Sequence, residues 1–141
     1  MTKLPLSPLP AHLQVFLAGP HPAVVATLRD DGSPVSAASW YRFDKGSIFL
    51  SVSATGHRLR HVRRDPRVAL TMLGDSWYTH VSLLGTVVEI SEDSDFSLVD
   101  ALARHYTGEP YPNHDAPGFV LRAEVERWHS FGEPGGPVPA P

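Results

Sequence analysis

The residues best suited to chemistry in this chain lie in one segment, residues 56–68, which contains five arginines and two histidines. We expect a short helix over residues 56–64, with Thr55 as its N-cap and Pro66 ending it. The first turn of a helix attracts anions, and Arg58 in that turn can donate two hydrogen bonds to one phosphate. The segment therefore indicates an anion-binding site, against the alternative that it is a solvated charged surface.

The same segment carries a histidine pair with the spacing of metal ligands, His57 and His61. They are four residues apart and would share one face of the helix. Because the neighbouring arginines would repel a cation, we assign no metal site. The sequence also lacks the Walker, Gly-x-Gly-x-x-Gly, His-Glu-x-x-His and Gly-x-Ser-x-Gly motifs, so the catalytic residues stay undetermined.

Hydroxyl and aromatic side chains on nearby strands are further candidates for the same site. Four serines are spaced two or three residues apart on strands expected to be neighbours: Ser36, Ser39, Ser51 and Ser53. Hydroxyls placed in this way can line one wall of a cleft, although ordinary surface alternation explains them equally well. Trp77 can stack on a flat ring, although a large aromatic in a small barrel is more often part of the core.

Hydrophobic patterning predicts the elements that must position these residues. Strands are expected over residues 22–29, 34–43, 48–53, 67–73, 77–91 and 119–128, and helices over residues 11–18, 56–64 and 93–106. The turn at residues 30–33 predicts a hairpin between the first two strands, and the first three strands should form a meander. Gly85 indicates a bulge in the long strand, Asp93 or Ser94 caps the last helix, and Gly108 ends it.

This order of elements predicts a mainly β protein, a small antiparallel barrel of six strands with a few short helices. The 141 residues, 42% of them hydrophobic, suffice for one domain over residues 1–131, and residues 132–141 are expected to be a disordered tail. A net charge of −3 argues against nucleic-acid binding, and no apolar run predicts a membrane span. The lack of cysteine and of an export signal favours a cytoplasmic protein.

Three stretches of the chain resemble a known family: Val24–Pro34, Arg58–Val68, and Leu84–Thr86 with Trp77 before it. They are similar to the split β-barrel flavin and deazaflavin oxidoreductases, the superfamily of pyridoxamine 5'-phosphate oxidase. Within it, the chain resembles the branch that uses coenzyme F-420, and the likeness covers residues 12–128. The resemblance implies a six-stranded split β-barrel that forms a homodimer, with a cofactor site in each groove between the subunits.

Carried over by position, the resemblance assigns nine residues to cofactor binding. Arg58, where the family usually has lysine, is expected to hold a phosphate, and Leu59 follows it. The strand before the helix would run along the cofactor, the second strand would face its ring, and Trp77 would contribute an aromatic surface. The assigned residues are Ser36, Ala37, Ser39, Ser51, Val52, Ser53, Arg58, Leu59 and Trp77. The chain has Gly56 and His61 where the family often has a basic residue and asparagine.

The chemistry that the resemblance implies is hydride transfer from reduced coenzyme F-420 to a small-molecule acceptor that is electron-poor and flat, for instance an enone, quinone or tetrapyrrole. Two alternatives stay open. One is an FMN-dependent enzyme similar to pyridoxamine 5'-phosphate oxidase, and the other is a protein that carries a cofactor or tetrapyrrole without turnover. The identity of the cofactor decides the reaction class, because FMN permits oxidase chemistry whereas a deazaflavin reacts poorly with oxygen.

Overall fold

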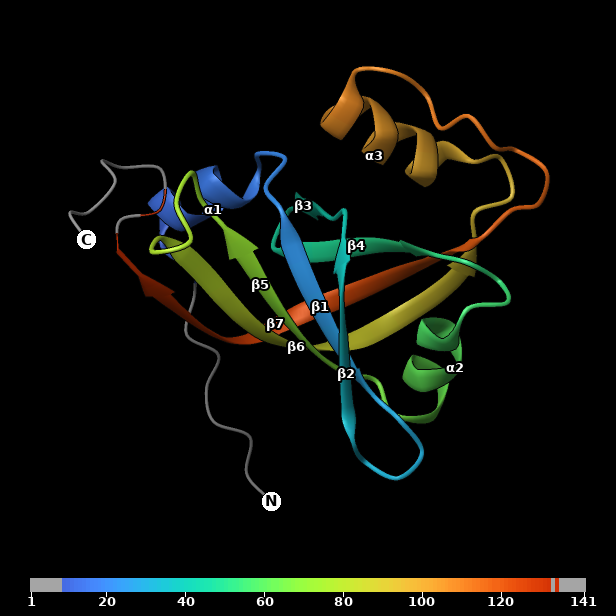
Figure 1. Ribbon diagram of the computed structural model, residues 1–141, viewed down its shortest axis with the longest axis horizontal. Coiled ribbons are helices and arrows are strands. Elements are labelled where there is room, and N and C mark those ends of the chain that lie inside the picture. The colour runs from blue at the N-terminus through green and yellow to red at the C-terminus, as the bar shows by residue number, and fades with distance from the viewer. Residues whose placement is uncertain (1–8, 133, 135–141) are drawn as a thin grey trace.

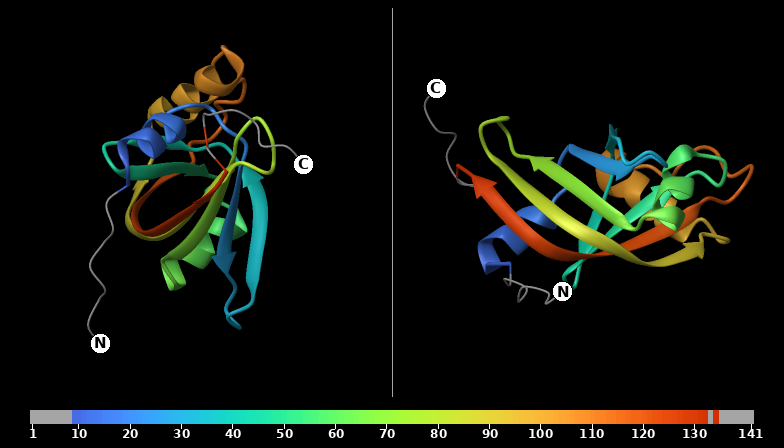
Figure 2. Two further views of the ribbon diagram at one scale, coloured as in Figure 1. Left: turned by 90° about the vertical axis from the view of Figure 1, so that its left-hand side faces the viewer. Right: turned by 90° about the horizontal axis from the view of Figure 1, so that it is seen from below.

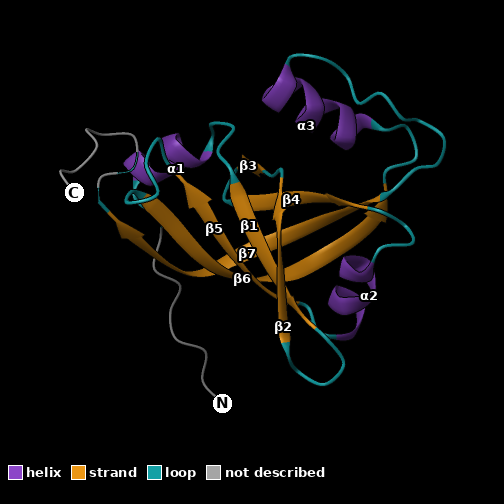
Figure 3. Cartoon of the chain, in the orientation of Figure 1, coloured by secondary structure: helices purple, strands orange, loops and turns teal. Residues whose placement is uncertain are grey.

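The structure is a computed structural model that describes residues 9–132 and 134, so most of the expected tail at residues 132–141 lies outside the described residues. Within that part of the chain, three helices lie at the margins of one sheet (Figures 1 and 3). The helices are α1 (Ala11–Leu17), α2 (His57–Arg64) and α3 (Ser97–Thr107). The strands are β1 (Ala23–Leu28), β2 (Pro34–Ser39), β3 (Arg42–Asp44), β4 (Ser47–Val52), β5 (Arg67–Leu73), β6 (His80–Glu92) and β7 (Phe119–Phe131). None of these helices is long and apolar enough to cross a membrane.

The strands form one antiparallel sheet in the order β2-β1-β5-β6-β7-β4-β3, which confirms the predicted mainly β class. β2 and β3 are the two ends of this order, yet only Trp40 and Tyr41 separate them in the chain. Two intervening residues span about 11 Å at most, so the sheet curls until its two edges meet at this point (Figure 2). Away from that junction, no strand pairing joins β2 to β4 in the described residues, and a split separates them.

The segment predicted as one strand over residues 34–43 is two strands, and the predicted meander is wrong. β2 pairs with β1, whereas β3 pairs with β4. The break falls at Tyr41 because its side chain turns into the core, where it is fully buried. Its hydroxyl donates hydrogen bonds to the carbonyls of Leu17 (2.9 Å) and Gly19 (3.1 Å), which ties the junction to the end of α1. The sheet therefore has seven strands in the described residues where six were expected.

Turn and bulge residues behave as the sequence predicts at two positions. The β1–β2 hairpin forms, and Gly32 in its turn has φ +84°, a conformation that glycine adopts without strain. Gly85 marks a bulge, because the register of β6 against β7 shifts between Leu84 and Gly85. A Cβ atom at Gly85 would lie 2.6 Å from the carbonyl oxygen of Glu124, so the two strands approach too closely for a side chain there.

The long strand predicted to start at Trp77 starts at His80 instead. Residues 74–79 form a tight turn, in which the Thr79 N–H donates to the Ser76 carbonyl (3.0 Å). Trp77 is therefore in the loop between β5 and β6.

The start of α3 is also later than predicted, at Ser97, and its N-cap residue is Phe96 rather than Asp93 or Ser94, although Asp93 still binds first-turn N–H groups of the helix. The carboxylate of Asp93 accepts hydrogen bonds from the N–H groups of Leu98 (3.1 Å) and Val99 (3.0 Å). Asp93 itself is buried. Gly108 ends the helix with φ +86°, as predicted.

The two faces of the curled sheet differ in character. The inner face forms the core, with fully buried side chains that include Val25, Leu70, Met72, Val81, Leu83 and Leu121. Residues paired across antiparallel strands share a face, and the central part of the opposite face of β2, β1, β5 and β6 carries no charged residue, with Arg67 at the start of β5 beyond it. We call this the outer face; it comprises Ser36, Ala38, Val24, Ala26, Ala69, Thr71, Ser82 and Leu84. Leu84 is 50% exposed on it.

Candidate functional site

A groove of about 790 Å³ lies in the split between β2 and β4 and reaches α2. We call it the cationic groove. Six of the nine predicted residues line it: Ser36, Ala37, Ser51, Val52, Ser53 and Arg58. The curl of the sheet creates this arrangement, because β2 and the end of β4 lie on opposite sides of the split and α2 follows β4 directly.

Arg58 is a half-buried cation in the wall of this groove. Its Nη1 donates a long hydrogen bond to the hydroxyl of Ser39 (3.4 Å). No ion pair joins it to a carboxylate within residues 9–132. Burial lowers the pKa of the Arg58 guanidinium because desolvation disfavours the charged form, but arginine stays protonated at neutral pH. A partly desolvated charge without a counter-ion is suited to bind an anion.

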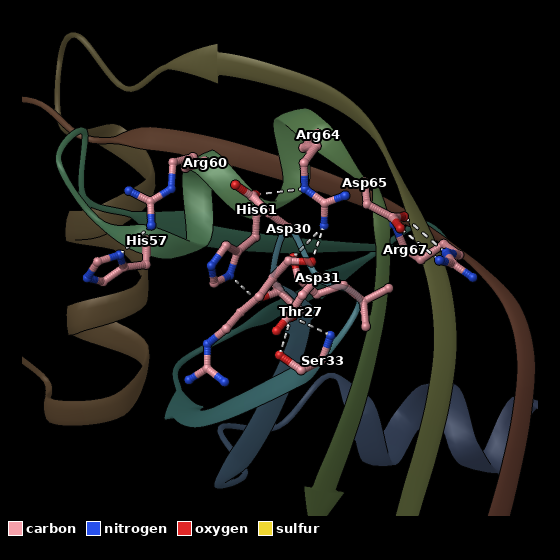
Figure 4. Close-up of polar contacts among 12 residues, drawn as sticks. Thr27, Asp30, Asp31, Ser33, His57, Arg60, His61, Arg64, Asp65 and Arg67 are labelled. Carbon is pink, nitrogen blue, oxygen red and sulfur yellow. Dashed lines mark hydrogen bonds and ion pairs between the residues drawn. The ribbon is translucent and has the colours of Figure 1, made fainter.

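Two other arginines of the segment have structural roles (Figure 4). Arg64 forms an ion pair with Asp30 (2.9 Å) and donates to backbone carbonyls at the end of β1, which fastens α2 to the β1–β2 turn. Arg67 pairs with Asp65, with 2.7 Å between Nη2 and Oδ2. Asp65 and Arg67 thus form a local ion pair around Pro66, and Arg64 and Arg67 are not part of the anion site.

Sequence reasoning missed three further basic residues that line the cationic groove, Arg29, His57 and Arg60. Arg60 Nη2 donates to Nδ1 of His57 (2.8 Å), so the two side chains lie together at the N-terminal end of α2 (Figure 4). The alternation of side chains along β1 could have indicated that Arg29, the residue after this strand, faces the groove. Residues two apart share a face, and the groove-lining residues Val25, Thr27 and Arg29 have this spacing.

His61 connects α2 to β1. It is 5% exposed, and its Nδ1 is 2.9 Å from the hydroxyl oxygen of Thr27. Burial lowers the pKa of His61, and the nearby Arg60 and His57 lower it further. In residues 9–132 and 134, no group of three or more His, Cys, Asp or Glu side chains could hold a metal ion.

The predicted N-cap of α2 is wrong. The N-cap residue is Gly56, and no side chain caps the helix. Thr55 instead forms a local turn, with its N–H donating to Ser53 Oγ (3.3 Å). The first-turn N–H groups of α2 therefore have no side-chain acceptor, and Gly56 lines the groove next to them.

Three predicted residues lie outside the cationic groove. Leu59 is 2% exposed and belongs to the core, because it lies on the buried side of α2. Ser39 lies just beyond the groove and contacts it through its bond to Arg58. Trp77 is 72% exposed, on the β5–β6 loop, which is at the end of the sheet opposite α2 (Figure 1).

A second hollow of about 490 Å³ adjoins the groove, and we call it the aromatic pocket. It shares Ser51, Val52 and Ser53 with the cationic groove, so the end of β4 lies between the two. Its other walls come from the β2–β3 junction, the start of α3 and the segment before β7. The aromatic side chains among them are Trp40, Phe96 and Tyr111.

A groove lined by several arginines lies in the split of a curled antiparallel sheet. The sequence profile described as pyridoxamine 5'-phosphate oxidase matches residues 9–132, which is nearly the whole described chain. The chain belongs to this family. Its members have the split β-barrel fold and bind flavin-type cofactors, and they include oxidoreductases as well as proteins without catalytic activity.

Solved structures with this fold include several of similar length. One named as an F-420 reductase is 22% identical, with a TM-score of 0.79, over 86% of this chain and 98% of the other. A conserved hypothetical protein from Mycobacterium tuberculosis is 24% identical, with a TM-score of 0.72, over 99% and 96% of the two chains. General Stress Protein 26 from Bacillus anthracis is 15% identical, with a TM-score of 0.64, over 85% and 94%. At these identities the likeness establishes the fold.

The residues of the cationic groove fit a flavin-type cofactor. Such a cofactor carries a phosphate, and Arg58 offers a half-buried guanidinium that no carboxylate neutralises in the described residues. The groove volume of about 790 Å³ is within the usual range for small-molecule sites. Arg58 would hold the phosphate, and the end of β4 would run along the rest of the molecule.

Proposed function

We propose that this chain is an oxidoreductase that binds coenzyme F-420 and transfers hydride from its reduced form to an electron-poor organic acceptor. The observation that carries the proposal is the unneutralised, half-buried Arg58 at the start of α2. Coenzyme F-420 has an acidic tail in addition to its phosphate. Arg29 and Arg60 supply further positive charge on the same groove, and of its two lining aspartates Asp30 is paired with Arg64, so the groove charge favours this cofactor over FMN.

When bound, the cofactor would supply two-electron chemistry, as the donor of a hydride to the acceptor. The residues of the chain bind the cofactor and orient it toward the acceptor. Arg58 fixes the phosphate end, and the hydroxyls of Ser51 and Ser53 lie where the two hollows meet. Holding donor and acceptor in contact accounts for catalysis without a nucleophilic side chain.

We also propose that the protein is a homodimer that pairs through the outer face. Seven of the eight residues of this face are small or medium-sized and all are uncharged, which suits a flat contact between two copies. The distance between Trp77 and α2 within one chain supports a shared site. In a homodimer, the partner subunit's Trp77 is free to meet the cationic groove of the first.

The location we propose is the cytoplasm, where a dissociable cofactor is supplied by diffusion. The chain has no cysteine, so an oxidising compartment would give it no disulfide. Fractionation of cells that express the full chain tests this, and recovery in an exported fraction would contradict it.

The deciding experiment is titration of the purified protein with coenzyme F-420 and with FMN side by side, followed by fluorescence. We expect coenzyme F-420 to bind at least about tenfold more tightly, since the groove carries cations for a longer anion. Tighter binding of FMN, or a protein that purifies yellow, would instead indicate the FMN-dependent alternative. Binding of reduced coenzyme F-420 with no turnover across diverse acceptors would indicate a carrier.

A further inference from the structure

We propose that the aromatic pocket binds the hydride acceptor, and that this acceptor is a neutral, planar aromatic molecule. The pocket and the cationic groove share Ser51, Val52 and Ser53, so ligands in the two hollows would meet at the end of β4. The role of the pocket as an acceptor site rests on the proposed function. Its choice of ligand rests on its own lining.

Charge separates the two hollows. Arg29, Arg58 and Arg60 line the cationic groove together with Asp31 and with Asp30, which is paired with Arg64. No lysine or arginine lines the aromatic pocket, and Asp115 is its one charged lining residue. An anionic ligand would meet the Asp115 carboxylate there, and the nearby Arg58 lines the cationic groove instead, with its guanidinium bonded to Ser39.

The start of α3, at the edge of the same pocket, offers no anion site either. The buried carboxylate of Asp93 already accepts the hydrogen bonds of the Leu98 and Val99 N–H groups. Because these donors are occupied, the helix terminus cannot attract a carboxylate or phosphate from the ligand.

Aromatic rings supply the apolar walls of the pocket. Trp40 is stacked on Tyr106, with ring centroids 5.4 Å apart and planes 17° apart. Tyr111 meets Trp40 edge-on at 6.4 Å. Phe96 and Val99 line the pocket from the start of α3, and the hydroxyls of the shared serines reach its polar edge. Flat aromatic faces with a few hydrogen-bonding groups at one side favour a planar ring with a polar substituent.

The outer wall of the pocket is held in place without a ligand. Residues 109–118 form this wall, and we call them the strap. Asp100 on α3 anchors the strap, because its Oδ1 accepts a hydrogen bond from the Tyr111 N–H (3.0 Å) and lies 2.8 Å from Nε2 of His114. The ring of His114 also stacks on Phe96, at 4.3 Å and 5° between planes.

The C-terminal end of the strap is held in place as well. The carbonyl of Gly118 accepts a hydrogen bond from the Asp93 N–H (2.9 Å), and a Cβ atom at this glycine would collide with the Val52 carbonyl. The strap therefore adjoins the shared end of β4 directly. A wall that is ordered before the ligand arrives loses little conformational entropy on binding.

The test uses two probes of the same shape that differ in charge, 2-naphthamide and 2-naphthoate, with the full chain and ligand-observed NMR. We expect Val99→Trp, which fills the pocket, to abolish 2-naphthamide binding. Tyr111→Ala should weaken it about two- to tenfold, the range for loss of one aromatic contact. Phe131→Ala removes an exposed aromatic that lines neither hollow and should leave the affinity unchanged.

The anionic probe, 2-naphthoate, is expected to bind in the cationic groove. Any binding of 2-naphthoate should survive Val99→Trp and be lost in Arg58→Ala. Circular dichroism confirms that each variant is folded, and Tyr111→Ala, at a 37% exposed position on the strap, keeps the test valid if Val99→Trp does not fold.

The outcomes distinguish this inference from the proposed function. If the protein binds coenzyme F-420 but its affinity for 2-naphthamide is the same in wild type, Val99→Trp and Tyr111→Ala, the pocket assignment is overturned and the proposed function stands. If 2-naphthamide responds as expected but neither coenzyme F-420 nor FMN binds, the pocket assignment stands and the proposed function fails. Retained binding of coenzyme F-420 by a Val99→Trp protein that has lost 2-naphthamide supports both.

Discussion

Arg58 differs from its neighbouring arginines in what surrounds it. Arg64 and Arg67 are neutralised by Asp30 and Asp65, whereas Arg58 has one long hydrogen bond to Ser39 and no ion pair in the described chain. The same side-chain type therefore serves two purposes within one segment. Sequence alone could indicate the cluster, but only the curl of the sheet shows which of its members face the split.

At this scale we predict that Arg58→Ala weakens coenzyme F-420 binding by about 1.5–3 kcal/mol, the range for a hydrogen bond to a charged group. That is roughly a 10- to 150-fold rise in dissociation constant, measured by fluorescence titration. The melting temperature should stay nearly the same, since the one bond lost in the free protein is 3.4 Å long.

The matched control is Arg67→Ala, which removes the same side chain from a surface ion pair outside the groove. It should leave the affinity within about twofold, because exposed pairs contribute little and distant charge is screened. Equal affinity of wild type and Arg58→Ala would remove Arg58 from the site.

At the scale of elements, the contact between α2 and β1 depends on a neutral imidazole. His61 is buried against Thr27, and burial, with Arg60 and His57 nearby, lowers its pKa from the ordinary value of 6.5. Arg29 also lowers it, while Asp30 opposes the shift. A proton on this ring would place an unpaired charge between helix and strand.

We therefore predict that stability falls as the pH drops below about 6.5. In the unfolded chain His61 takes up its proton near that pH, whereas in the folded chain it resists until the pH reaches its lowered pKa. Stability is fully present above the unfolded value and is lost through this window. Burial lowers the pKa of His21 as well, which adds to the same slope.

Thermal unfolding between pH 7.5 and pH 5.5 measures this effect. His61→Asn should reduce the slope, which is the change in melting temperature per pH unit, because an amide does not titrate and can still form a hydrogen bond with Thr27. His12→Asn, which changes an exposed histidine on α1, should leave the slope unchanged. An unaltered slope in His61→Asn would show that this histidine is not the responsible group.

Elements were predictable where local chemistry decides them and not where tertiary contacts do. β5, the β1–β2 hairpin, the bulge at Gly85 and the end of α3 at Gly108 follow from patterning and turn residues. The split of residues 34–43 into two strands was not predictable, because it depends on Tyr41 reaching the carbonyls at the end of α1. The apparent start of a strand at Trp77 failed for a related reason, since hydrogen bonds of a local turn compete with the sheet.

The candidate site also has a part that the sequence predicts and a part that only tertiary contacts determine. A family motif locates Arg58 and the end of β4, but not the aromatic pocket, whose walls come from four segments separated by up to 79 positions, from Ser39 to Gly118. No periodicity relates Trp40 to Tyr111. Their proximity follows from the junction of β2 with β3 and from the anchoring of the strap to Asp100.

At the scale of the whole molecule, we predict a dimer of twice the 15.4 kDa of one chain by light scattering. Leu84→Glu, which places a charge beside Ala69 on the outer face, should shift the mass to that of a monomer, because burying the new carboxylate in the contact costs its hydration. If the cofactor sites are shared, the same variant should lose coenzyme F-420 binding.

Val15→Glu serves as the control, since Val15 is 76% exposed on α1 and lies off the outer face. It should leave both mass and affinity unchanged. A wild-type protein that scatters light as a monomer at working concentration would contradict the dimer. A Leu84→Glu monomer that still binds coenzyme F-420 normally would show that each site is complete within one chain.

The exposed edge of β2 also affects how newly made chains associate. It bonds to β1 along one side, contains no charged residue between Pro34 and Ser39, and is exposed at most of its positions. Such an edge has none of the lysines or glutamates that protect lone strands, so it is a template for strand addition. A newly made subunit is therefore open to unwanted strand pairing along the same strand that borders the groove.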